Sequence, residues 1–115
     1  MESILTSIKK LIGVGAEYTP FDSDIIMHIN TVFKDLRRLG VGPAKGFIIE
    51  DDTSVWTDYI ADPIECADVK SYMYLRVKLL FDPPTNASHL ESIKEQIKKF
   101  EWTINVDAES EETEV

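Results

Sequence analysis

Hydrophobic side chains recur every three or four positions along much of this 115-residue chain, a spacing that places them on one face of an α-helix. The first such stretch predicts a short helix within residues 2–12, which Gly13 ends. The second predicts a longer helix that Asp22 or Ser23 caps and that ends at Gly40. The apolar face of this second helix consists of Ile25, Ile29, Val32, Leu36 and Leu39.

The second half of the chain shows the same periodicity three more times. Thr53 or Ser54 is expected to cap a short helix, and a long helix is expected over residues 64–81. Because the long helix is apolar on so much of its circumference, we expect it at the centre of a bundle. A last helix is predicted to begin after Ser88 as its cap and to continue to Val106.

The segment between the second and third predicted helices has a different pattern. Residues 40–46 contain three glycines and a proline, which indicate a loop. The Phe47–Ile49 run that follows has the composition of a strand but is only three residues long. It is either an extended loop held by its apolar side chains or an edge that pairs with a neighbouring subunit. The expected fold is mainly α, a small helical bundle of about four helices with a loop or short-strand insertion.

Charge changes this picture at the C-terminus. The chain carries 21 acidic and 12 basic residues, a formal net charge of -9, which argues against sequence-independent binding to phosphate backbones. Residues 107–115 read DAESEETEV, a composition expected to be disordered when no partner is bound. We therefore divide the chain into a helical domain, residues 1–106, and an acidic C-terminal tail, residues 107–115.

Candidate chemistry is sparse. His28 and His89 are isolated in the sequence, and Cys66 is the one cysteine, so a buried structural role is expected for its thiol. The carboxylates of residues 50–52 are contiguous and lack the spacing of a calcium loop. We therefore expect no catalytic residue, no cofactor and no metal. Residues 1–13 are interrupted by lysines and are predicted to be neither a signal peptide nor a membrane span.

Aromatic residues give the stronger indication. Trp56, Tyr59 and Trp102 lie in or near short or terminal helices, where a small core can cover them only in part. Such residues are frequent anchors in protein interfaces, so a core position and an interface position are equally expected for Trp56 and Trp102.

The order of several short segments resembles a known family, the small head–tail connector (adaptor) proteins of tailed bacteriophages. The resemblance spans roughly residues 20 to 105. Its segments are Phe21–Asn30, Leu39–Pro43, Phe47–Glu50, Trp56–Ile60, Lys78–Pro84 and Phe100–Trp102.

This resemblance implies a helical subunit of a homo-oligomeric ring, expected to be a dodecamer, beneath the portal protein in the virion neck. The ring would be assembled in the host cytoplasm, extend the DNA channel without binding DNA specifically, and carry the next neck or tail-completion protein. No membrane partner is expected. The family's portal-directed C-terminal segment would fall on residues 103–115. The expected protein-interface residues are Phe47, Ile48, Ile49, Trp56, Tyr59, Trp102, Thr103, Asn105, Asp107, Glu109, Glu111 and Glu112.

Two alternatives remain open. A small acidic protein can mimic DNA and inhibit a nucleic-acid-processing enzyme, although here the basic residues are interspersed through the helices. A small enzyme would be indicated if changing His28 or Cys66 abolished a turnover without unfolding the chain.

Overall fold

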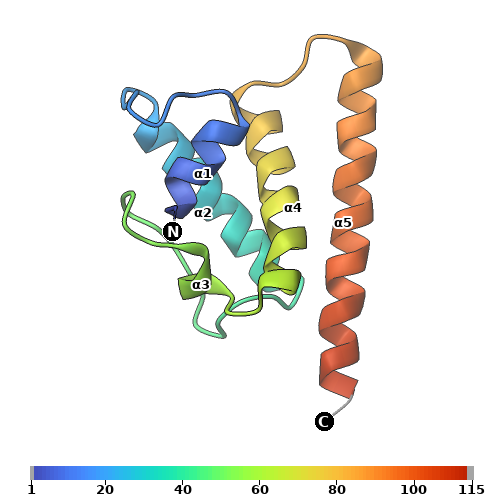
Figure 1. The fold of residues 1–115 in the computed structure, drawn as a ribbon. Coiled ribbons are helices and arrows are strands. Elements are labelled where there is room, and N and C mark those ends of the chain that lie inside the picture. The colour runs from blue at the N-terminus through green and yellow to red at the C-terminus, as the bar shows by residue number, and fades with distance from the viewer. Residues whose placement is uncertain (1, 114–115) are drawn as a thin grey trace.

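Five helices make up the fold within residues 2–113, the part of the chain that the computed structural model describes (Figure 1). They are α1 (Ile4–Leu11), α2 (Asp22–Arg38), α3 (Trp56–Tyr59), α4 (Pro63–Phe81) and α5 (Ala87–Thr113). The prediction of a mainly α bundle is confirmed. Side chains are described as far as Ala108.

Helices α2 and α4 form the centre of the bundle, as the all-round apolar pattern of α4 predicts (Figure 1). α1 packs on both, and α5 stands beside α4 on the opposite side from α1. The periodic apolar faces meet in one core, which removes their side chains from water. Its fully buried members include Ile4, Ile8, Ile25, Ile29, Val32, Leu36, Tyr72, Met73 and Val77.

The helix ends follow ordinary capping chemistry, with two corrections to the sequence prediction. The Asp62 side chain accepts a hydrogen bond from the Ile64 amide at 2.9 Å, ahead of a proline at the first position of α4. α5 is capped by Asn86, whose Oδ1 accepts from the His89 amide at 3.0 Å, and not by Ser88. α2 begins directly at Asp22, without a side-chain cap.

A larger correction concerns the C-terminal segment. The predicted end of the last helix at Val106 was wrong, because α5 continues to Thr113. Glutamate is a good helix former, so an acidic sequence that extends an existing helix has a favourable propensity. The proposed boundary at residue 107 therefore falls inside a helix. That residues 107–115 act as a separate unit in binding a partner stays a prediction.

The Phe47–Ile49 run is an extended loop and forms no strand within the described residues. Ile49 is buried, and the Asn30 side chain holds its backbone on both sides. The Ile49 amide donates to Asn30 Oδ1 at 2.8 Å, and Asn30 Nδ2 donates to the Ile49 carbonyl at 2.9 Å. The Asn30 amide group thus supplies the two hydrogen bonds that a neighbouring strand would give. Pairing of this run with another subunit remains a prediction.

Trp56 and Tyr59 lie in the core of the single chain, which for Trp56 is one of the two positions that the sequence left open, and a role of either residue in an interface stays a prediction. Each is 6% exposed. Trp56 Nε1 donates to the Ser7 hydroxyl at 2.8 Å, and the Tyr59 ring lies 4.5 Å from that of Phe33. α1 covers Trp56 through Ser7, whereas Phe33 of α2 and Phe47 of the loop pack on Tyr59, so other elements bury rings that the four-residue α3 could not bury alone.

Candidate interaction surface

Helix α5 is held to the rest of the molecule along one face. Ile93, Ile97 and Ile104 are buried on the α4 side, and Phe100 is partly buried between them. Near the end of α2, Asn105 Nδ2 donates to the Leu39 carbonyl at 3.2 Å. These contacts fix the direction in which the last turns of α5 point.

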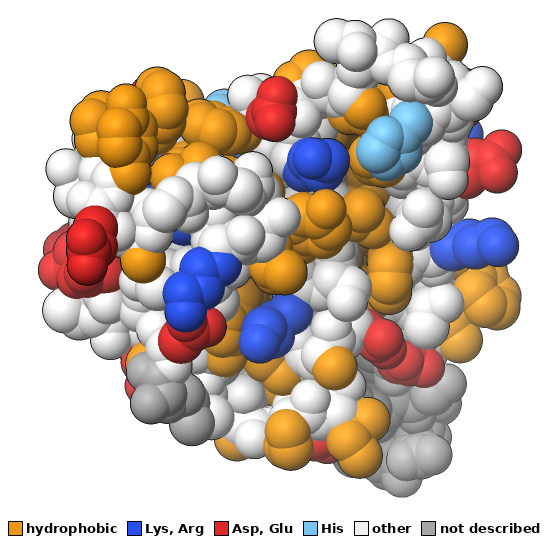
Figure 2. Space-filling view, turned by 45° about the horizontal axis from the view of Figure 1, so that its top comes forward, with side chains coloured by type: hydrophobic (Ala, Val, Ile, Leu, Met, Phe, Trp, Pro, Cys, Tyr) orange, Lys and Arg blue, Asp and Glu red, His pale blue; other side chains and the backbone are white. Residues whose placement is uncertain are grey.

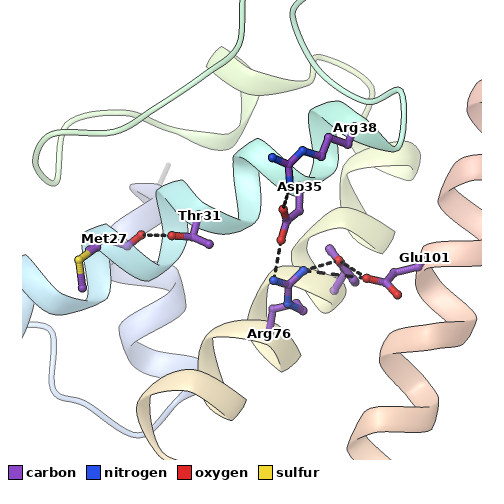
Figure 3. A network of polar contacts seen from close by, with 7 residues as sticks. Met27, Thr31, Asp35, Arg38, Arg76 and Glu101 are labelled. Atoms are coloured by element: carbon purple, nitrogen blue, oxygen red, sulfur yellow. Dashed lines mark hydrogen bonds and ion pairs between the residues drawn. The ribbon is translucent and has the colours of Figure 1, made fainter.

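A polar network connects α2, α4 and α5 (Figure 3). Arg76 of α4 pairs with Asp35 of α2 at 2.7 Å and donates to the Tyr72 hydroxyl at 2.6 Å. That hydroxyl in turn donates to Glu101 Oε2 of α5 at 2.7 Å. Burial, together with the hydrogen bond to Glu101, raises the pKa of Tyr72 to about 12, so the phenol stays protonated at neutral pH and acts as the donor.

The outer side of α5 is different, because it carries a large aromatic side chain that the fold leaves uncovered. Trp102 is 70% exposed. Thr103 beside it is half-buried. Asp107 is exposed but lies on the side toward α4, where it lines a shallow pocket with Val69 and Ile104. An indole in contact with water on a rigid helix is a common anchor of a protein–protein contact, since its rotamer entropy cost on binding is small.

The structure brings together only part of the predicted interface. Ile48 is 64% exposed, whereas Phe47 is half-buried with its ring 5.1 Å from that of Phe33. Ile49 is buried, and Asn105 is engaged with Leu39 as described above. The predictions for Glu109, Glu111 and Glu112 concern side chains outside the described part of the chain.

Sequence reasoning missed a second surface, an open groove of about 780 Å³ between α2 and the loop of residues 45–48. Met27, 58% exposed, and Ile48 form its apolar walls. Lys34, Arg37 and Lys45 also line it. Figure 2 shows hydrophobic side chains reaching the surface in patches with single Lys and Arg side chains among them. In the sequence, this groove is indicated by Asn30, Lys34 and Arg37, whose spacing places them on one side of α2.

The remaining candidate residues do not gather into a reactive site. Cys66 is buried, as expected, and burial raises the pKa of its thiol, which disfavours the nucleophilic thiolate. Among the described residues, no group of three or more His, Cys, Asp or Glu side chains could hold a metal ion. In the same part of the chain, none of the helices combines the length and apolarity needed to cross a membrane.

These features define a small, mainly helical protein with an exposed aromatic and an apolar groove, both typical of contact surfaces between proteins. The family model described as "Phage connector protein" matches residues 4–111. The chain therefore belongs to the phage connector protein family, a structural family, and this membership supports a head–tail connector role, association with portal or neck proteins and a place in the virion neck. No curated protein and no solved structure matches the chain.

Proposed function

We propose that this chain is a non-enzymatic subunit of a ring that lies beneath the phage portal, extends the DNA channel and joins the capsid to the neck or tail. The observation that carries the proposal is the family match over residues 4–111, which covers every helix from α1 to nearly the end of α5. A dodecamer is the copy number that the resemblance to head–tail connectors implies.

The geometry supports a role for α5 in portal contact. The helix is anchored by one face to α4 and by Asn105 to the end of α2, so its outer face and last turns are presented in a fixed orientation. Residues 107–115 continue from this anchored end of the helix and add carboxylates. A preorganised helix loses little conformational entropy when a partner binds.

The net charge of -9 supports the channel role. A wall of the same sign as DNA repels the phosphate backbone, so the duplex passes without adhering. This behaviour also separates the proposal from the DNA-mimic alternative, in which the acidic surface would bind a basic enzyme.

The test is imaging of the neck by cryo-electron microscopy, with portal protein and this chain co-expressed. We expect a ring of this chain on the portal, with α5 at the contact. A neck without this chain, or a purified chain that binds a basic DNA-processing enzyme and never the portal, would overturn the proposal.

A truncation tests the part assigned to the C-terminus. A stop codon after Ala108 removes the carboxylates of residues 109–115. It keeps Ala108, which packs closely on Gly40: a Cβ added to Gly40 would lie 3.0 Å from the Ala108 Cβ. We expect helicity to fall only by the share of the removed last turns of α5, and retention on immobilised portal to be weaker. Retention equal to that of the full chain would remove residues 109–115 from the portal contact.

A further inference from the structure

The groove between α2 and residues 45–48 has an unusual charge for this protein. Lys34, Arg37 and Lys45 line it, and the residues that line it include no Asp or Glu. The whole chain has 21 acidic residues against 12 basic ones, so a groove whose charged lining residues are all cations departs from the composition of the rest. Among the side chains described through Ala108, no carboxylate forms an ion pair with any of these three cations.

The groove also exposes apolar side chains to solvent. Ile26 and Phe47 are partly covered, whereas Met27 and Ile48 are 58% and 64% exposed. Methionine side chains adapt to aromatic partners and make favourable sulfur–aromatic contacts. The groove therefore suits an occupant that combines a large aromatic side chain with several carboxylates.

The end of α5 has both properties. Trp102 is the most exposed aromatic side chain among the described residues. Residues 107–115 follow directly and include five acidic positions, Asp107, Glu109, Glu111, Glu112 and Glu114. A tryptophan buries roughly 150–250 Å² when it is covered, and the carboxylates would then lie among the three groove cations.

We infer that the groove of each subunit receives, from a neighbouring copy of this chain, the Trp102 side of α5 with the carboxylates that follow on that side; the other carboxylates of residues 107–115 remain for the portal contact. The inference rests on the proposed ring and names the contact between its subunits. Asp35 of α2 faces α4 and α5 through Arg76, whereas Lys34 and Arg37 line the groove, so α2 separates the two surfaces. One copy can thus use both at once, and such a head-to-tail contact closes into a ring when the rotation between copies is right.

Cross-linking tests this contact directly. In a Cys66→Ala background, Thr31→Cys places a thiol in the groove, and Val106→Cys places one on α5, one turn after Trp102. We expect a disulfide-linked ladder of subunits when the chain carrying both substitutions is oxidised on the portal. The control pair, Thr31→Cys with Lys94→Cys, has its second thiol more than three helical turns earlier on α5 and is expected to give no ladder.

Charge reversal tests the chemistry. Lys34→Glu with Arg37→Glu is expected to lower the ladder yield by about tenfold or more, since like charges across a contact oppose association. Lys10→Glu with Lys94→Glu changes the net charge equally at exposed positions that pair with Glu2 and Glu91, and is expected to leave the yield unchanged. Adding Glu109→Lys with Glu112→Lys to the groove variant, which leaves both thiols in place, should restore the ladder.

The outcomes separate this inference from the proposed function. A portal-bound ring that is imaged normally but gives no Thr31–Val106 cross-link overturns the groove contact and leaves the connector role intact. Loss of portal binding by the unmodified chain overturns the connector role itself. A groove that retains double-stranded DNA, with binding lost in the Lys34→Glu, Arg37→Glu variant, would also overturn the subunit contact.

Discussion

Removal of one hydroxyl, by Tyr72→Phe, tests whether the polar network holds α5 to the central helices. Tyr72 is fully buried, accepts a hydrogen bond from Arg76 at 2.6 Å and donates one to Glu101 at 2.7 Å. The substitution removes both hydrogen bonds and leaves the ring in place. Any loss of stability therefore reports on the hydroxyl and not on core packing.

The magnitude follows from what each partner retains. A hydrogen bond to a charged group contributes about 1.5–3 kcal/mol, so two such bonds set an upper bound of about 3–6 kcal/mol. Arg76, however, keeps its ion pair with Asp35, and Glu101 is 40% exposed and regains water. The cost should fall well below the bound, at about 1–2 kcal/mol in the free energy of unfolding.

Equilibrium urea denaturation, followed by circular dichroism at 222 nm, measures this cost from the shift of the midpoint at constant slope. Tyr74→Phe is the matched control, because Tyr74 lies on the same helix, is half-buried, and makes no hydrogen bond through its hydroxyl within the described residues. We expect Tyr74→Phe to change stability by less than about 0.5 kcal/mol. Equal losses for the two variants would refute the role assigned to the network.

Three further perturbations have defined outcomes. Gly42→Ala places a Cβ 2.7 Å from the Tyr59 ring, whereas Gly13→Ala shares the positive φ but meets open space. We expect Gly42→Ala to lower the free energy of unfolding, measured with urea, by about 1–3 kcal/mol more than Gly13→Ala does. Equal losses would contradict the clash. Asn30→Leu removes both hydrogen bonds to Ile49 and should raise hydrogen exchange at its amide while the core of α4 stays protected; unchanged exchange would show that Asn30 does not hold the loop. Burial raises the pKa values of Tyr59 and Tyr72, the latter to about 12, so the unfolded state loses these protons first, and stability should fall as pH rises from about 10 to 12. A flat stability profile over that pH range would contradict the raised values.

Much of the fold could be predicted from the sequence because its helices are amphipathic and locally encoded. Ile25, Ile29, Val32 and Leu36 recur at helical spacing and all are buried. The network around Arg76 could not be predicted, since Asp35 lies 41 positions away and the Tyr72–Glu101 bond joins residues 29 apart. Periodicity reports which face of a helix is buried, but not which polar side chains meet across helices.

The errors and the positions left open have a common physical cause, which is that partners distant in the sequence override local composition. Trp56 was open between core and interface, and Ser7, 49 positions earlier, accepts its indole hydrogen bond in the core. The Phe47–Ile49 run has strand composition, yet a side chain supplies its pairing. The last turns of α5 were expected to be disordered on charge alone, although glutamate favours the helix that precedes them.

Correcting these positions sharpens the view of how the chain can assemble. With Trp56 and Tyr59 assigned to the core, stability and assembly draw on different aromatics, because Trp102 is 70% exposed and contributes little to folding. The groove cations and the carboxylates after α5 are likewise outside the core contacts. A subunit built this way can fold as a monomer and still carry two complementary surfaces, so association can wait for a template that brings copies together.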